Sequence, residues 1–194
     1  MSFLEKTGVT THFPPRSPPQ HVETKVREII QSWDLGIPKD KYEKTLVAGL
    51  HFGYAPYQHT SYDLQIAFSL FSFCVIAFDD AALIDPNAMR DFVPRFCDGK
   101  PQLAPLLDQL VNTANDLRPF LHEYGANTMH PALLMFANEE LWYTQHAKQS
   151  TIQPDAGAYI EYSRYKTGIT ESYAFGVWPK AICEGAEDYI QAIP

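Results

Sequence analysis

The chain has 194 residues, a net charge of -8 and 45% hydrophobic residues. This length and apolar content predict one folded domain with a buried core and exclude a disordered chain. The acidic balance argues against a nucleic-acid partner, so any bound phosphate must be met locally by a metal or a few cations. The 3 cysteines are scattered without a CxxC pair, which predicts reduced thiols and a cytoplasmic location.

Apolar residues recur at helical spacing and no alternating strand pattern of any length is present, which predicts an all-α fold. Residues 1–20 are rich in proline and are expected to form a flexible arm before a helical domain at 21–194. Gly125 is expected to close one helix and Pro131 to open the next. The predicted helices cover residues 22–33, 39–52, 61–83, 87–96, 103–121 and 131–149, followed by a segment at 154–173 and the start of a helix at 187–193.

The most informative stretch runs from Leu64 to Phe78, carries no charge and is followed at once by Asp79 and Asp80. It is shorter than the roughly 18 apolar residues that suggest a membrane span, so we interpret it as a buried helix. Its end then places two carboxylates at the edge of an apolar interior, where they repel each other and lose hydration. A divalent cation resolves this conflict, and carboxylate oxygens suit Mg²⁺. The alternative is an exposed helix end with two ordinary acids.

Two further groups could complete such a site. Asp85 lies nearby, and Pro86 could turn it back toward the pair, although Leu83 occupies the regular helical position four residues after Asp79. Arg164 precedes Gly168 in an aromatic segment, and a guanidinium binds phosphate oxygens in a bidentate manner. The alternative for Arg164 is a surface residue in a helix that ends at a glycine.

Ser72, Phe73 and Ile76 lie one and two turns before the acids, and we expect them to face the same cavity. Aromatic faces lining that cavity would stabilise a carbocation, although such rings are more often part of a core. The aromatic candidates for this wall are Phe52, Trp142 and Tyr173. The HExxH, GxSxG, P-loop and GxGxxG patterns are missing, which argues against zinc proteases, hydrolases, kinases and dehydrogenases.

The order of four short motifs resembles that of fungal class I terpene synthases of the trichodiene synthase family. The motifs are Phe78-Asp79-Asp80, Phe136-Ala137-Asn138-Glu139-Glu140, the segment from Tyr159 to Gly168, and Trp178-Pro179-Lys180. The resemblance runs from about Lys44 to the end of the chain, and the acid pair is its most specific part.

This resemblance implies a helical bundle around an apolar cavity, in which Mg²⁺ ionises an isoprenyl diphosphate, usually farnesyl diphosphate, and the carbocation then cyclises. Asp79 would be the principal metal ligand and Asp80 its supporter. Arg164 would sense the diphosphate, and Thr167 and Gly168 would lie at a helix break that relays substrate binding. No nucleic acid and no membrane span are expected.

The family also has a second metal motif, Asn/Asp-x-x-Ser-x-x-x-Glu, which would fall beyond Pro194. We therefore expect a partial terpene synthase domain that lacks its C-terminal helices. Three interpretations stay open: an active sesquiterpene synthase, a truncated and inactive homologue, and a helical interaction module without chemistry.

Overall fold

A computed structural model describes residues 17–80, 82–146, 155–167 and 169–183, together with Gln153 and Ile190. Every regular element in these ranges is a helix, which confirms the predicted all-α class. The α-helices are α2 (Gln20–Ser32), α3 (Lys39–Tyr54), α4 (Tyr62–Asp79), α5 (Pro86–Cys97), α6 (Pro105–Leu117), α7 (Glu123–His146), α8 (Gly157–Thr167) and α9 (Thr170–Val177). The short 3-10 turns are η1 (Ala55–Tyr57) and η2 (Arg118–Phe120).

Helix α4 is the centre of the fold, because α2, α3 and α6 all pack against it. Ser61 caps its start by accepting a hydrogen bond from the backbone N–H of Leu64 at 3.4 Å. The helix is long and apolar enough to cross a membrane, but 72% of it is buried inside the molecule. It is therefore a core helix, as the sequence predicts, and fully buried rings project from several of its sides.

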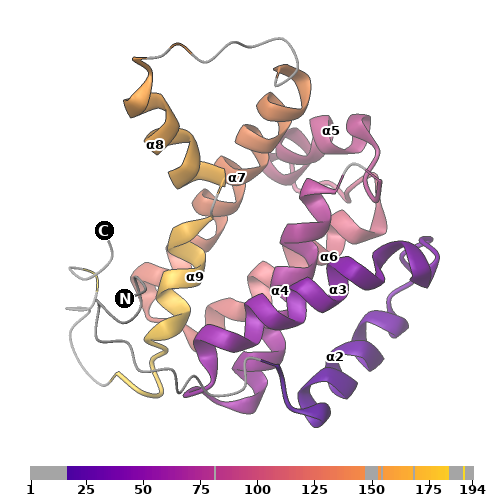
Figure 1. Cartoon of the computed structure of the whole chain (residues 1–194), viewed down its shortest axis with the longest axis vertical. Helices are drawn as coiled ribbons and strands as arrows, with labels where there is room; N and C mark the ends of the chain where they lie inside the picture. The colour runs from indigo at the N-terminus through magenta and orange to yellow at the C-terminus, as the bar shows by residue number, and fades with distance from the viewer. Residues whose placement is uncertain are drawn as a thin grey trace, which may run out of the picture.

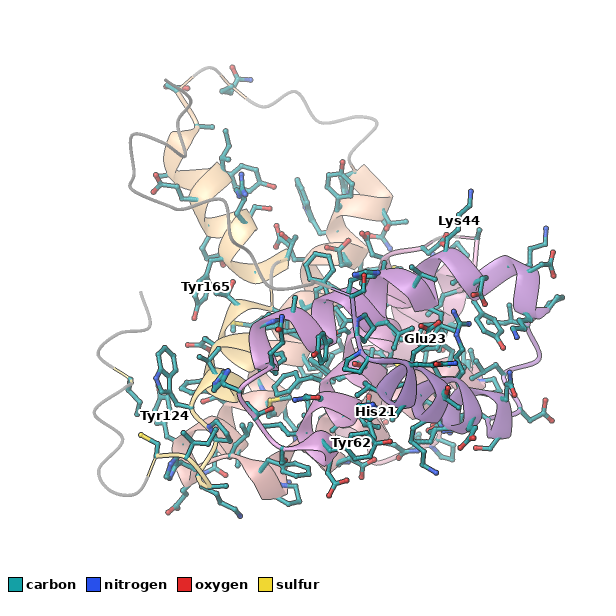
Figure 2. The ribbon with its side chains drawn as sticks, turned by 60° about the horizontal axis from the view of Figure 1, so that its bottom comes forward. His21, Glu23, Lys44, Tyr62, Tyr124 and Tyr165 are labelled. Atoms are coloured by element: carbon teal, nitrogen blue, oxygen red, sulfur yellow. The ribbon has the colours of Figure 1, made fainter. Side chains whose placement is uncertain are left out.

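Helices α3 and α4 approach until their backbones touch, because α3 has glycines where they meet. A Cβ atom built on Gly49 would lie 2.6 Å from the Cα of Phe73, and one on Gly53 would collide with the backbone of Ser69. No side chain larger than hydrogen fits at either position without a shift of the helices. Helix α2 also packs against α4, and the ring of its His21 stacks on the ring of Tyr62 at the start of α4 (Figure 2).

Helix α7 differs from the prediction, because it begins at Glu123 and continues through both Gly125 and Pro131. Gly125 is buried, and a Cβ there would lie only 3.0 Å from the Phe175 ring. The glycine therefore serves close packing of α7 on α9 instead of ending a helix. The prediction of a helix end at Gly125 and a start at Pro131 is wrong, because local breaker signals yield here to tertiary packing.

Other boundaries also shift. Helix α4 ends at Asp79 instead of residue 83, and a turn follows in which the backbone N–H of Leu83 donates to the carbonyl of Asp80 at 2.8 Å. The segment predicted at 154–173 covers helix α8 and the beginning of α9, which follows Ile169 in the left-handed region at φ 43°. Helix α8 and the end of α7 project away from α2, α3 and α4 (Figure 1). Most of the predicted proline-rich arm and of the predicted helix at 187–193 lies outside the described residues.

Candidate functional site: the acidic end of helix α4

The two aspartates lie where the apolar helix α4 meets solvent. Asp79 is exposed and Asp80 half-buried, whereas Phe78 just before them is fully buried. Asp80 is partly used by the chain itself, because its Oδ1 accepts a hydrogen bond from the backbone N–H of Ala82 at 3.0 Å. Asp79 is therefore the more exposed of the two carboxylates, whereas one oxygen of Asp80 is already bonded within the turn.

Glu140 of α7 forms a hydrogen bond with Asp79, although the sequence analysis gave it no role. Only 6% of Glu140 is exposed. Burial, followed by the hydrogen bond and the charge of Asp79 and by the charge of Glu139, raises the pKa of the Glu140 carboxyl to about 8. Two carboxyl groups in such close contact need a proton or a cation between them.

The neighbouring residue, Glu139, connects the same part of α7 to α8. The hydroxyl of Ser163 donates to its Oε1 at 2.8 Å, and the Nζ of Lys166 lies 3.7 Å from its Oε2. Lys166 also lies over the ring of Tyr162, 4.2 Å from its centroid. Glu139 and Glu140 together therefore join the acidic end of α4 to the projecting helix α8.

Helix α8 carries the predicted diphosphate-binding residues. Arg164 is exposed and makes no hydrogen bond or ion pair with another residue in the part of the chain that the structure describes. Thr167 ends the helix, and its hydroxyl donates to the carbonyl of Ser163 at 3.1 Å. Gly168 lies outside the described residues. A guanidinium without a protein partner is available for an anionic ligand.

Three of the predicted pocket residues lie close together. The hydroxyl of Tyr173 on α9 donates to the Oγ of the buried Ser72 at 3.1 Å. Phe52 and Tyr173 both line a hollow of about 400 Å³ between the C-terminal end of α3, the turn η1 and α9, which we call the α3–α9 hollow. Its lining residues are Phe52, Pro56, Tyr57, Thr170, Tyr173, Ala174 and Val177.

The remaining predicted residues are placed differently. Phe73 packs against residues of α3 and of the end of α2, where the ring centroids of Tyr42 and Trp33 lie 5.7 and 6.4 Å from its own. Trp142 lies near the C-terminal end of α7 and packs edge-on against Tyr159 of α8, with ring centroids 5.9 Å apart. Ile76, half-buried, lies one turn beyond Ser72 on the same helix face.

Asp85 is exposed at the start of α5. Its Oδ1 accepts a hydrogen bond from the backbone N–H of Asn87 at 2.8 Å, so the carboxylate acts as the N-cap of that helix. This bond occupies one oxygen of the carboxylate that the sequence analysis considered as an additional metal ligand.

The acidic end of α4 provides few protein ligands for a magnesium ion. Within the described ranges, no group of three or more His, Cys, Asp or Glu side chains is arranged to hold a metal ion. Mg²⁺, however, usually takes only one or two carboxylates and completes its shell with water and substrate phosphates. The contact between Asp79 and Glu140 supplies two carboxyl groups whose repulsion a cation would relieve, so these residues fit such an ion.

Glu139 and Glu140 could have been found from the sequence by the reasoning that identified Asp79. They too follow an apolar run, Leu133–Ala137, and are adjacent acids at its end. That pattern predicts carboxylates at the edge of a core, and both side chains are indeed buried, with 7% and 6% exposed.

The chain is similar in sequence to known proteins that bear on this carboxylate site. No family model matches the chain. It is 27% identical over 194 residues to monoterpene synthase 25 of Postia placenta, covering 99% of this chain and 57% of that protein. It is 26% identical over 156 residues to terpene synthase BipA of Cochliobolus sativus, covering 75% of this chain and 45% of that protein.

The chain is thus a distant homologue of fungal terpene synthases, and it spans about half the length of the curated relatives it matches. The all-helical fold is consistent with part of a terpene synthase domain.

Proposed function

We propose that the chain is a class I terpene synthase in lineage, which binds an isoprenyl diphosphate with Mg²⁺, ionises it and cyclises the carbocation. One observation carries the proposal: Glu140 of α7 meets Asp79 at the end of the apolar helix α4. A shared proton or cation is needed there, and a diphosphate leaves only when its charge is neutralised.

Each side chain would have a separate task. Mg²⁺, when bound, would neutralise the charge of the diphosphate leaving group. Asp79 and Glu140 would hold the ion, with help from the second oxygen of Asp80. Arg164 would contact the diphosphate from α8, whose position relative to α7 is supported by the contacts of Glu139. Thr167 and Gly168 would adjust the end of α8 to the bound ligand.

The hydrocarbon would lie along α4, away from the acids. At about 1.5 Å per residue, Ser72 is roughly 10 Å from Asp79 along the helix. The α3–α9 hollow lies near Ser72, because Tyr173 contacts both. Aromatic faces such as those of Phe52 and Tyr173 stabilise cations, and an apolar wall keeps water from the reactive intermediate.

Two isoprenyl diphosphates of different chain length are candidate substrates. The resemblance in the sequence favours farnesyl diphosphate and therefore a sesquiterpene product. The relative from Postia placenta is named a monoterpene synthase, which favours geranyl diphosphate as the second candidate. We place the reaction in the cytoplasm, with a diphosphate substrate and no nucleic-acid partner.

The test is incubation of the 194-residue chain with C10, C15 and C20 prenyl diphosphates and Mg²⁺, followed by gas chromatography of the products. Asp79→Asn should abolish any product. Asp63→Asn, which alters an exposed acid at the other end of α4, should leave product formation unchanged. If the unaltered chain forms no hydrocarbon or alcohol from any substrate, its catalytic activity is rejected.

An inactive homologue and a helical interaction module are the remaining interpretations, and binding separates them. Inorganic diphosphate with Mg²⁺ should raise the melting temperature of a chain that retains the site. At a concentration of 100 times Kd, such a ligand adds about 2.7 kcal/mol of stability. Binding without product would indicate the inactive homologue, and no binding would indicate the interaction module.

A further inference from the structure

Tyr173 has an unusual position, because its backbone and its side chain are both held by partners from other elements. The hydroxyl of Tyr57 in η1 donates to its carbonyl oxygen at 2.7 Å. Its own hydroxyl donates to Ser72 of α4 at 3.1 Å. Its ring centroid lies 5.9 Å from that of Phe71 and 6.2 Å from that of Phe68, both on α4. The side chain is therefore fixed across the space between α9 and α4.

The same ring lines the α3–α9 hollow. Tyr57, Ala174 and Val177 continue this lining, and Phe52 stands at the rim with 63% of its surface exposed. Behind the Tyr173 hydroxyl lies the buried Ser72 of α4, which accepts its hydrogen bond. The ring thus lines the hollow on its α4 side, where the tyrosine hydroxyl is bonded to Ser72.

We propose that Tyr173 sets the depth of the α3–α9 hollow and thereby the length of the isoprenoid chain that the protein accepts. The proposal rests on the function given above, because it treats the hollow as the end of the hydrocarbon site. The chemical class follows from the lining, which is aromatic and aliphatic apart from Thr170 and the tyrosine hydroxyls. A volume of about 400 Å³ lies in the range of small-molecule pockets.

A wall residue acts on length selectivity in a characteristic way. Removing the ring while keeping the rim should admit additional carbons at the inner end without weakening contacts elsewhere. A single methylene in an apolar pocket changes affinity by about tenfold or more. The hydrogen bond to Ser72 orients the ring but fills little space, so its loss alone should leave selectivity almost unchanged.

The experiment measures the binding of geraniol, farnesol and geranylgeraniol by calorimetry in metal-free buffer. These alcohols have no diphosphate, so Asp79, Glu140 and Arg164 take no part. In Tyr173→Ala, the ratio of the geraniol Kd to the geranylgeraniol Kd should rise by at least about tenfold over that of the unaltered chain. If that variant does not melt cooperatively, Tyr173→Leu replaces it, with the same direction expected.

Two controls isolate the depth of the hollow. Tyr173→Phe keeps the ring and should hold the ratio within about twofold, because only the hydroxyl is lost. Phe52→Ala removes a rim residue and should weaken all three alcohols alike. An unchanged ratio in the Tyr173→Ala or Tyr173→Leu chain, or no binding of any alcohol to the unaltered chain, would overturn the proposal.

The outcomes also separate this inference from the proposed function. A chain that shows the Tyr173-dependent ratio but makes no product keeps the depth role and loses the catalytic proposal. A chain that makes a terpene while its ratio stays unchanged keeps the catalytic proposal and loses the depth role.

Discussion

The helix pair α3–α4 is closely packed and buried, whereas helix α8 is loosely packed and exposed. Gly49 and Gly53 let α3 touch the backbone of α4, and most of α4 is buried. Helix α8 has no buried residue and projects with the end of α7 (Figure 1). The first region concentrates the packing that stabilises the fold, whereas the second presents Arg164 to solvent. Stability and ligand contact are thus placed on different elements, which Glu139 and Glu140 connect.

The largest expected effect is the loss of a ring from the core. Phe78 is fully buried and lies 5.4 Å from the rings of both Phe92 and Phe136. Phe78→Ala should lower the free energy of unfolding by about 4 kcal/mol, measured by urea denaturation. Tyr162→Ala on α8, where 56% of the residue is exposed, should change it by no more than about 0.5 kcal/mol. Equal losses in the two variants would contradict the comparison.

A smaller but more local effect should come from a single added methyl group. In Gly53→Ala, the new Cβ would collide with the backbone of Ser69, and we expect a loss of about 3 kcal/mol. Gly157→Ala in α8 is the matched control, because nothing lies within 4 Å of its Cβ position. Since alanine favours helix, this second variant should be unchanged or more stable by up to about 1 kcal/mol. A tolerated Gly53→Ala would show that α3 and α4 can separate freely.

The third effect is a pH dependence that originates in Glu140. Because its pKa is raised from 4.5 to about 8 in the folded chain, the folded state binds this proton more tightly than the unfolded state does. Its contribution to stability is fully present below pH 4.5 and is lost as the pH rises toward about 8. We expect a loss on the order of 2 kcal/mol across that window in metal-free denaturation.

Glu140→Gln should flatten this dependence, whereas Glu161→Gln, a change of an exposed acid on α8, should leave it intact. If the free energy of unfolding of Glu140→Gln still falls as the pH rises from 4.5 to about 8, the pH dependence originates in another group.

The smallest effect on stability should come from Arg164→Ala, within about 0.5 kcal/mol, because the side chain is exposed and has no partner among the described residues. Its affinity for Mg²⁺-diphosphate, in contrast, should fall by about tenfold, as a lost charge-assisted hydrogen bond implies. Arg90→Ala on α5 is the control for charge, since Arg90 is exposed and its guanidinium donates to the side-chain oxygen of Asn87 at 3.3 Å. If both variants bound Mg²⁺-diphosphate with similar affinity, Arg164 would not be part of the diphosphate site.

The sequence predicts those features that depend on local patterns. The uncharged run before Asp79 predicts a buried helix with acids at its end, and α4 has that form. The contact between Asp79 and Glu140 depends on how α4 and α7 lie relative to each other, which no local pattern encodes. The role of Glu139 toward α8 is hidden for the same reason.

Breaker residues explain the errors at helix boundaries. Gly125 and Pro131 ordinarily mark helix ends, but both lie inside α7. The packing of Phe175 against α7 requires a small residue at position 125. Gly125 is therefore explained by this close contact and not by the end of a helix. Phe73 shows a related limit, because periodicity places it about two turns before the acids but does not say that Trp33 and Tyr42 cover it.

The burial of α4 also has a consequence for synthesis on the ribosome. Helices α2 and α3 precede α4 along the chain, but α6, which also covers it, ends only at Leu117. At about 5–20 residues per second, one apolar side of α4 waits several seconds for its partner. The close fit of α3 through Gly49 and Gly53 can form during that interval and protects the other side. We therefore expect nascent chains that end between α4 and α6 to be those most readily captured by chaperones.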